Sequence, residues 1–250
     1  MNARERGPVP RQTTGPVGYV EEFVACRDVV FLVADAGIRA MVAGFFSGAK
    51  APAHILLGDC APIAFDPHLD IVPAQGNDPG VWKSSREYLR RKEPTHRRAV
   101  VILDNDWDGS PGPERIRADI SADLAGWEQH AVIVIEPELE AWFWRDHPGL
   151  WDLMLWKEKY GQTPRKVLEQ ANLWPSDADK PPRPKEAIAY LRKRYRINVE
   201  NATFGRVAAQ LSVLHCKDIA FLQLATTLRE WFPADSPMTS SSETISVETG

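Results

Sequence analysis

Residues 99–115 read AVVILDNDWDGSPGPER. A short apolar run opens the stretch and leads into three aspartates, Asp104, Asp106 and Asp108, which are spaced two residues apart and followed by a glycine. Such a run is typical of a strand that is buried on both faces. The aspartates that follow it indicate one of three things: a calcium loop, an acidic site at the end of a strand, or a solvated turn.

The calcium-loop interpretation fails on its own pattern. An EF-hand needs a bidentate glutamate at loop position 12 and a helix before the loop. Position 12 is Arg115, and Pro111 and Pro113 interrupt the second half of the loop. The residues before Asp104 favour a strand instead of a helix. An acidic strand end and a plain turn of capping residues both stay open.

The sequence around this stretch predicts an α/β fold with a mainly parallel sheet flanked by helices. The expected strands cover residues 29–34, 53–58, 69–72, 99–104 and 130–136. The expected helices between and after them cover residues 37–47, 78–93, 113–127 and 137–146, the second with Asp78 as N-cap. Alternation of this kind produces parallel strands joined by right-handed crossovers.

Strand patterns stop near residue 150, and the rest of the chain favours helices at 165–174, 184–196 and within 203–231. The predicted organisation therefore has four parts. They are a flexible arm (1–18), an α/β domain (19–150), a C-terminal helical subdomain (151–233) and a disordered tail (234–250).

Composition limits the class of protein. The chain has 250 residues, of which 26% are charged, and a net charge of -4, so nucleic-acid binding would need local basic patches. Its apolar runs fall short of the ~18–20 residues that span a bilayer, so no membrane partner is expected. The three cysteines show no CxxC spacing, and the polar N-terminus lacks the apolar core of a secretory signal. A cytoplasmic location is expected.

Nine tryptophans are unusual, and six of them lie between Trp127 and Trp174. Large aromatic side chains in such a cluster favour a packed core over a base-stacking or partner surface.

The acidic residues follow two neighbouring strands of the expected sheet. Besides the aspartates at 104–108, the glutamates Glu136, Glu138 and Glu140 follow the next strand. Ligands of open α/β sheets bind at the carboxyl ends of the strands. Mg²⁺ is held there by one or two carboxylates together with water and phosphate oxygens. A metal site is therefore one prediction, and a set of turn-forming acids is the plain alternative.

Three segments resemble known families. VVILDNDWDG resembles the DxD motif of the Toprim fold, which topoisomerases, primases and OLD-family nucleases share. EPELEAWFWRD is similar to the Glu-Ala-Trp segment of RloB-like and related Toprim-like families from prokaryotic defence islands. Lys185, within KPPRPKEAIAYL, resembles a lysine of those families. The resemblance covers roughly residues 29–231.

The resemblance implies a Toprim-like protein of an anti-phage system, including the methylation-associated kind, with other defence-system proteins as partners and DNA or RNA as substrate. It implies Mg²⁺ (or Mn²⁺) as cofactor, with Asp104 and Asp106 as ligands and Asp108 in an outer position. Glu140 matches the glutamate before Ala-Trp. Glu138 is two residues from Glu140 and on a helix would face another way.

One position departs from the Toprim pattern. Toprim enzymes carry a glutamate, proposed as general acid/base, after the first strand, where this chain has Ala34 followed by Asp35. Either Asp35 substitutes as the catalytic group or the reaction is lost. A Mg²⁺-dependent nuclease and an inactive binding or regulatory subunit both stay open, and a small-molecule phosphohydrolase with a helical lid is a third possibility.

Two basic stretches complete the candidate site. Residues 190–196 include Arg192 and Arg194, and residues 84–98 carry further arginines and lysines. Such runs form either solvated helix faces or contacts to a phosphate backbone. Under the second interpretation, Lys185, Arg192 and Arg194 bind substrate, and the two stretches flank the acidic crevice. The sequence leaves the oligomeric state open.

Overall fold

The computed structural model describes residues 26–47, 60–61, 63–145, 147–157, 160–211 and 216–233. The expected arm (1–18), the apolar run at 53–58 and the expected tail (234–250) lie outside the described residues.

Four parallel strands form the sheet, in the order β2-β1-β3-β4. They are β1 (Arg27–Val33), β2 (Ile71–Pro73), β3 (His96–Asp104) and β4 (Gln129–Ile135). The central strands β1 and β3 are apolar along most of their length and almost entirely buried, because helices cover both faces of the sheet. The predicted α/β fold with a parallel sheet is confirmed.

Strand order reverses between β1 and β3, and this reversal is where open α/β sheets bind ligands. The chain moves outward from β1 to β2, then returns across β1 to place β3 on its other side. Val33, the last residue of β1, is level with Ile102 of β3, and Asp104 is level with Ile135 of β4. The residues just beyond Val33 therefore lie beside the end of β3.

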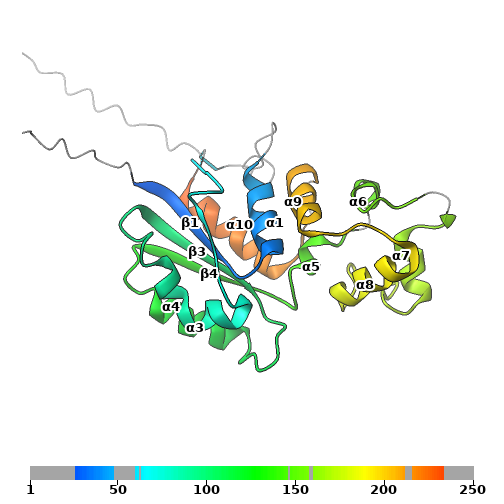
Figure 1. Ribbon diagram of the computed structural model, residues 1–250, viewed down its shortest axis with the longest axis horizontal. Coiled ribbons are helices and arrows are strands. Elements are labelled where there is room, and N and C mark those ends of the chain that lie inside the picture. Colours follow the sequence, from blue (N-terminus) through cyan, green and yellow to red (C-terminus); the bar gives the residue numbers. More distant parts are fainter. Residues whose placement is uncertain are drawn as a thin grey trace, which may run out of the picture.

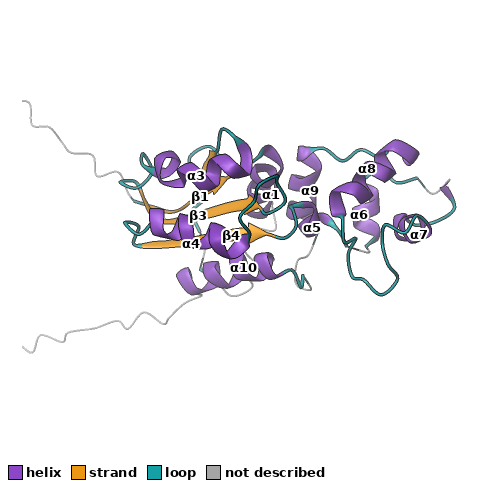
Figure 2. Ribbon diagram, turned by 90° about the horizontal axis from the view of Figure 1, so that it is seen from below, coloured by secondary structure: helices purple, strands orange, loops and turns teal. Residues whose placement is uncertain are grey.

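Helices cover the sheet in two layers (Figures 1 and 2). α3 (Asn77–Leu89) and α4 (Pro113–Asp123) lie on one face, and α1 (Ala36–Phe46) and α10 (Ile219–Trp231) lie on the other. Side chains at four-residue spacing along α4 and at its C-cap are buried: Ile116, Ile120 and Leu124. Within the described part of the chain, no helix is both long and apolar enough to cross a membrane.

The remaining helices are α5 (Glu140–Phe143), α6 (Pro148–Leu153), α7 (Pro164–Gln170), α8 (Pro184–Tyr195) and α9 (Asn201–Gln210). α6, α7 and α8 lie beyond the carboxyl edge of the sheet (Figure 1). The chain then returns, because α9 packs on α1 and α10 packs on β4. The stretch 203–231, expected to be helical, forms these two helices, with Asp218 as the N-cap of α10.

Most tryptophans in the middle of the chain pack into the core, as predicted. Five of the six in the middle of the chain are buried: Trp127, Trp142, Trp144, Trp151 and Trp174. Trp144 and Trp174 meet edge to face, with ring centroids 5.4 Å apart. The indole N–H of Trp144 donates to the carbonyl oxygen of Pro184 at 3.0 Å, so the buried ring leaves no polar group unsatisfied.

A buried polar cluster ties the amino edge of the sheet. The Asp70 carboxylate accepts from the Arg27 guanidinium, from His96 Nε2 at 3.1 Å and from the Asp66 backbone N–H at 2.6 Å. Asp70 is fully buried, and burial alone would raise the pKa of its carboxyl. The hydrogen bonds from Arg27, Asp66 and His96 outweigh burial and lower that pKa below its usual value.

We expect Asp70→Asn to lower the free energy of unfolding by about 3 kcal/mol, because it leaves the Arg27 charge facing a neutral group. A lowered native pKa stabilises the fold above the unfolded-state value of about 3.9, and this contribution is lost as pH falls through the native pKa. Urea unfolding from pH 7 to pH 3 measures it. The wild type should lose more stability than Asp70→Asn below pH 4, and parallel pH profiles would contradict the assignment.

Candidate functional site

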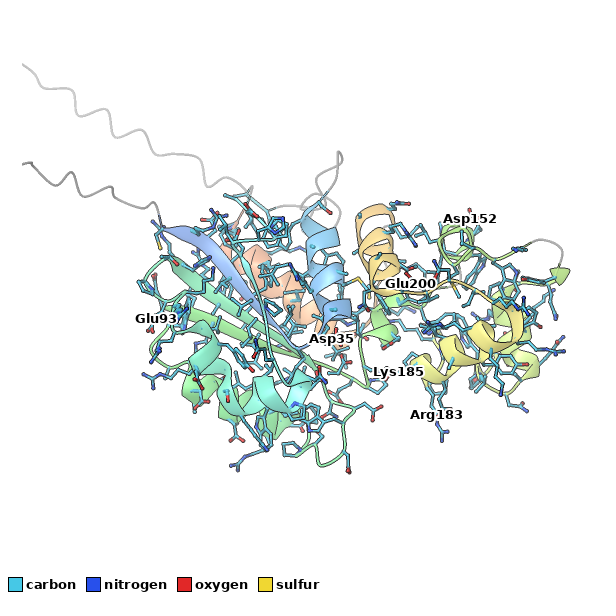
Figure 3. All side chains as sticks on the ribbon, in the orientation of Figure 1. Asp35, Glu93, Asp152, Arg183, Lys185 and Glu200 are labelled. Atoms are coloured by element: carbon cyan, nitrogen blue, oxygen red, sulfur yellow. The ribbon has the colours of Figure 1, made fainter. Side chains whose placement is uncertain are left out.

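Four carboxylates and one lysine gather at the carboxyl edge of the sheet. They are Asp35 after β1, Asp78 in the first turn of α3, Asp104 at the end of β3, Glu140 at the start of α5 and Lys185 in α8. Each is close enough for its charge to shift the pKa of at least one other member of the group. Figure 3 labels Asp35 and Lys185 on either side of the space between the sheet and α8.

Asp104 lies at the centre of this acidic cluster. Its residue surface is only 5% exposed, and its Oδ1 is buried without a hydrogen-bond partner. Burial, followed by the charges of Asp78, Asp35 and Glu140, raises the pKa of Asp104 well above its usual range. A buried carboxylate beside three others is costly unless a proton or a cation neutralises it.

Asp78 was predicted to cap α3, and this prediction is wrong. Gly76, with a φ of 104°, holds the N-cap position instead, and Asp78 lies inside the first turn. Its Oδ1 accepts from the backbone N–H of Asp104 at 2.8 Å, and burial is the chief cause of its raised pKa. The sequence signal was the short distance from β2 to α3, which places the first turn of the helix at the carboxyl edge.

Asp35 belongs to the acidic cluster although it stands one residue after the expected position. β1 ends at Val33, so strand alternation does not continue to Asp35, and Ala34 takes the buried place. Asp35 caps α1, its Oδ1 accepting from the Ile38 backbone N–H at 2.8 Å. Its charge raises the pKa of Asp78, Asp104 and Glu140.

Glu138 holds the lysine of the site, a role that the sequence did not indicate. The residue is 3% exposed, its Oε1 accepts from the Lys185 backbone N–H at 2.7 Å, and its Oε2 forms an ion pair with Lys185 Nζ at 2.7 Å. Burial opposes the charge of Lys185, but its interaction with the Glu138 carboxylate and the charges of Glu140, Glu138 and Asp104 outweigh burial and raise the pKa of Lys185. For Glu140 the effect of burial is the opposite, and burial is the chief cause of its raised pKa.

Asp106 and Asp108 lie apart from the central carboxylate. Both are exposed, and the charges that chiefly raise the pKa of Asp104 are those of Asp78, Asp35 and Glu140. β3 ends at Asp104, and the loop then turns toward the neighbouring segment, with the Asp106 N–H donating to the Pro137 carbonyl at 3.1 Å. The two-residue spacing therefore does not place the three aspartates on one strand face.

No closed metal site is formed. Across the residues that the structure describes, no group of three or more His, Cys, Asp and Glu side chains is arranged to hold a metal ion. The donors near Asp104 are all hard oxygens, which suit Mg²⁺ or Mn²⁺. Mg²⁺ commonly uses one or two carboxylates and takes its other ligands from water and substrate.

A cavity of about 370 Å³ adjoins the cluster between α8 and α9. Glu140, Lys185, Arg192 and Asn201 are among the residues that line it. Arg192 therefore lies beside the candidate site. Arg194, two residues further along α8, is exposed and is not part of this lining.

The basic stretch 84–98 does not flank the crevice. It runs from α3 into the amino end of β3, and Figure 3 places Glu93 at the far end of the sheet from Asp35. The expectation that two basic patches border the acidic residues is therefore wrong for this stretch. Parallel strands put their amino ends on the opposite edge, so a basic run before a strand cannot reach the acids that follow it.

The site thus combines several carboxylates with raised pKa values, a lysine fixed by a buried glutamate, and an adjoining cavity with a second cation. Such groups can bind a cation, neutralise a phosphate and exchange protons. Comparison of the chain with protein-family models, with curated proteins and with solved structures finds no match.

Proposed function

We propose that the protein is a Toprim-like, Mg²⁺-dependent nuclease that cleaves DNA or RNA as a component of a prokaryotic anti-phage defence system. The observation that carries the proposal is the buried Asp104 carboxylate, whose Oδ1 has no partner and which faces three further carboxylates at the β1/β3 switch point. This is the place where open α/β sheets bind ligands. The resemblance of residues 99–109 and 136–146 to Toprim-like proteins supports the same function.

The donor set fits a divalent cation. Asp104 would hold Mg²⁺ or Mn²⁺ through its orphaned oxygen, with Asp35 or Glu140 as the second carboxylate. Bound there, the ion supplies positive charge to a phosphodiester and lowers the pKa of its water. Asp106 and Asp108, which the sequence favoured as ligands, are exposed and fit an outer position.

The chain's own residues would divide the remaining work. Lys185, held by Glu138 with its Nζ at 2.7 Å, would neutralise a phosphate oxygen of the substrate. Arg192 would contact the next phosphate along the cavity that it shares with Lys185. Glu140, with its raised pKa, or Asp35 would exchange protons with the attacking or leaving oxygen.

A second candidate function is a binding or regulatory subunit of a multi-protein defence complex. Two observations favour it. Ala34 stands at the position of the Toprim glutamate, and the Asp35 that follows uses one carboxylate oxygen to cap α1. Such a protein would bind metal and nucleic acid at the same site without cleaving the strand.

Cleavage assays on labelled single-stranded DNA, double-stranded DNA and RNA separate the two functions. We expect the wild type to cleave at least one of them with Mg²⁺ or Mn²⁺ and none in EDTA. Asp106→Asn should keep most of the activity because Asp106 is exposed, and Asp123→Asn, an exposed change on α4, serves as matched control. Metal-dependent binding without cleavage would favour the subunit. Cleavage that does not require metal, or the absence of both nucleic-acid binding and cleavage, would contradict the proposal.

A further inference from the structure

A second cavity lies beside α5 and the residues that follow it. Its volume is about 540 Å³, within the usual range for small-molecule sites. Glu140 begins α5 and faces the acidic cluster, whereas Trp142 and Trp144, further along the same segment, line this cavity. Its lining shares no residue with the cavity beside Lys185.

The lining of the second cavity is rich in basic residues. They are Arg145, Arg165, Lys180 and Lys217, and the one carboxylate among the described lining residues, Asp179, pairs with Lys217 Nζ at 3.2 Å. Arg165 is fixed in place, since its guanidinium stacks over the Trp174 ring at 5.0 Å and bonds to Glu169 at 2.9 Å. A wall of this charge favours an anionic ligand.

Lys180 has a buried ammonium group that makes no hydrogen bond within the described residues. Its Nζ forms an ion pair with Asp218 Oδ2 at 3.6 Å, which is beyond hydrogen-bond distance. The other oxygen of Asp218 already accepts from Trp142 Nε1 at 2.8 Å and from the Phe221 N–H at 3.1 Å. An ammonium has three N–H donors, so a buried one that makes no hydrogen bond is unsatisfied.

The structure assigns this second cavity, we propose, as a binding site for a nucleotide. Phosphate oxygens of the ligand would accept from Lys180 and pair with Arg145 and Lys217. Trp142 and Trp144, which also line the cavity, would provide apolar surface for a base or sugar. A free phosphate would satisfy the charges but leave most of a 540 Å³ space unfilled. The site needs neither the metal nor the acidic cluster.

Calorimetric titration of the full chain with ADP in EDTA tests this assignment, with inorganic phosphate as the second probe. We expect ADP to bind the wild type and Asp104→Asn equally, because the acidic cluster takes no part. Lys180→Met should weaken ADP binding by about 10-fold or more, the loss expected for a charge-assisted hydrogen bond. Lys193→Met, an exposed change on α8, should leave binding unchanged.

A second variant, at an exposed residue of the cavity, keeps the test decisive if Lys180→Met does not fold. Lys217 is 81% exposed, so Lys217→Met will fold, and we expect it to weaken ADP binding several-fold. Absence of ADP binding to the wild type, or equal binding by the wild type and both lysine variants, would overturn the site. Phosphate binding as tight as ADP binding would overturn the nucleotide assignment. Loss of ADP binding in Asp104→Asn would place the ligand at the acidic cluster instead.

Discussion

Substitution of Gly44 by alanine is expected to lower the free energy of unfolding by about 3 kcal/mol. α1 and α9 approach so closely at this point that a Cβ on Gly44 would lie 2.2 Å from the Gly205 carbonyl oxygen and 2.9 Å from the Ala208 Cβ. Within a helix, alanine is intrinsically more favourable than glycine by about 1 kcal/mol, which would stabilise the variant. The steric clash outweighs this gain in helix propensity. The space that the new Cβ would need is occupied by backbone atoms of α9 and not by a flexible side chain that could move away.

Denaturant unfolding of the purified variant measures this loss. Gly126→Ala is the matched control, because a Cβ there meets only the end of the Glu93 side chain at 3.4 Å. We expect that control to stay within about 0.5 kcal/mol of the wild type. A Gly44→Ala protein as stable as the wild type would show that α1 and α9 do not pack this closely.

The same contact positions the candidate site. α9 carries Asn201 and Phe204, which line the cavity beside Lys185, and a Cβ on Gly37 of α1 would lie 3.7 Å from Asn201 Oδ1. Displacing α9 from α1 would therefore open this cavity as well as weaken the fold. Small residues at 44, 205 and 208 are what allow a C-terminal helix to complete a site built mainly from the α/β layer.

The central strands could be predicted because each contains a continuous apolar run, which is typical of a strand buried on both faces. β1, β3 and β4 each fall within three residues of the predicted bounds at either end. The three-residue strand β2 overlaps the strand expected at 69–72 but begins and ends later, at Ile71 and Pro73. The close packing of α1 on α9 could not be predicted, since a glycine within a helix has several explanations until its neighbour is known.

The candidate site was predicted in part. Asp104, Glu140 and Lys185 follow from position at strand ends and from the family resemblance, and the structure brings them together. Asp78 was missed because it was predicted to be a helix cap. Glu138 was missed because a helix was assumed to begin at Pro137, and on such a helix Glu138 would face away from Glu140. The helix starts only at Glu140, so that argument did not apply. Contacts between residues far apart in the sequence depend on the tertiary structure, and local sequence patterns do not reveal them.

Under the proposed nuclease function, Asp104→Asn is expected to impair cleavage severely, and independently of that function it is expected to make the protein more stable. Asparagine has the same shape but carries no charge, so it removes a buried carboxylate that three neighbouring acids disfavour. We expect a melting temperature higher by several degrees at pH 7 in EDTA, since a chain of this size gains about 2–4 °C for each kcal/mol. Cleavage should fall by at least about 100-fold, because loss of a ligand weakens metal binding at least as much as loss of its supporting partner.

The pH dependence separates this explanation from a general packing effect. A native pKa raised above the unfolded value of about 3.9 stabilises the fold at low pH, and that contribution is lost as pH rises through the native pKa. The advantage of Asp104→Asn in thermal melts should therefore shrink toward pH 4, where the wild-type carboxyl is protonated. Millimolar Mg²⁺ should raise the melting temperature of the wild type and leave the variant unchanged, because only the charged oxygen attracts the ion. A variant that melts below the wild type at pH 7 in EDTA would show that Asp104 has a partner that stabilises its charge, which would remove the reason to expect a cation there.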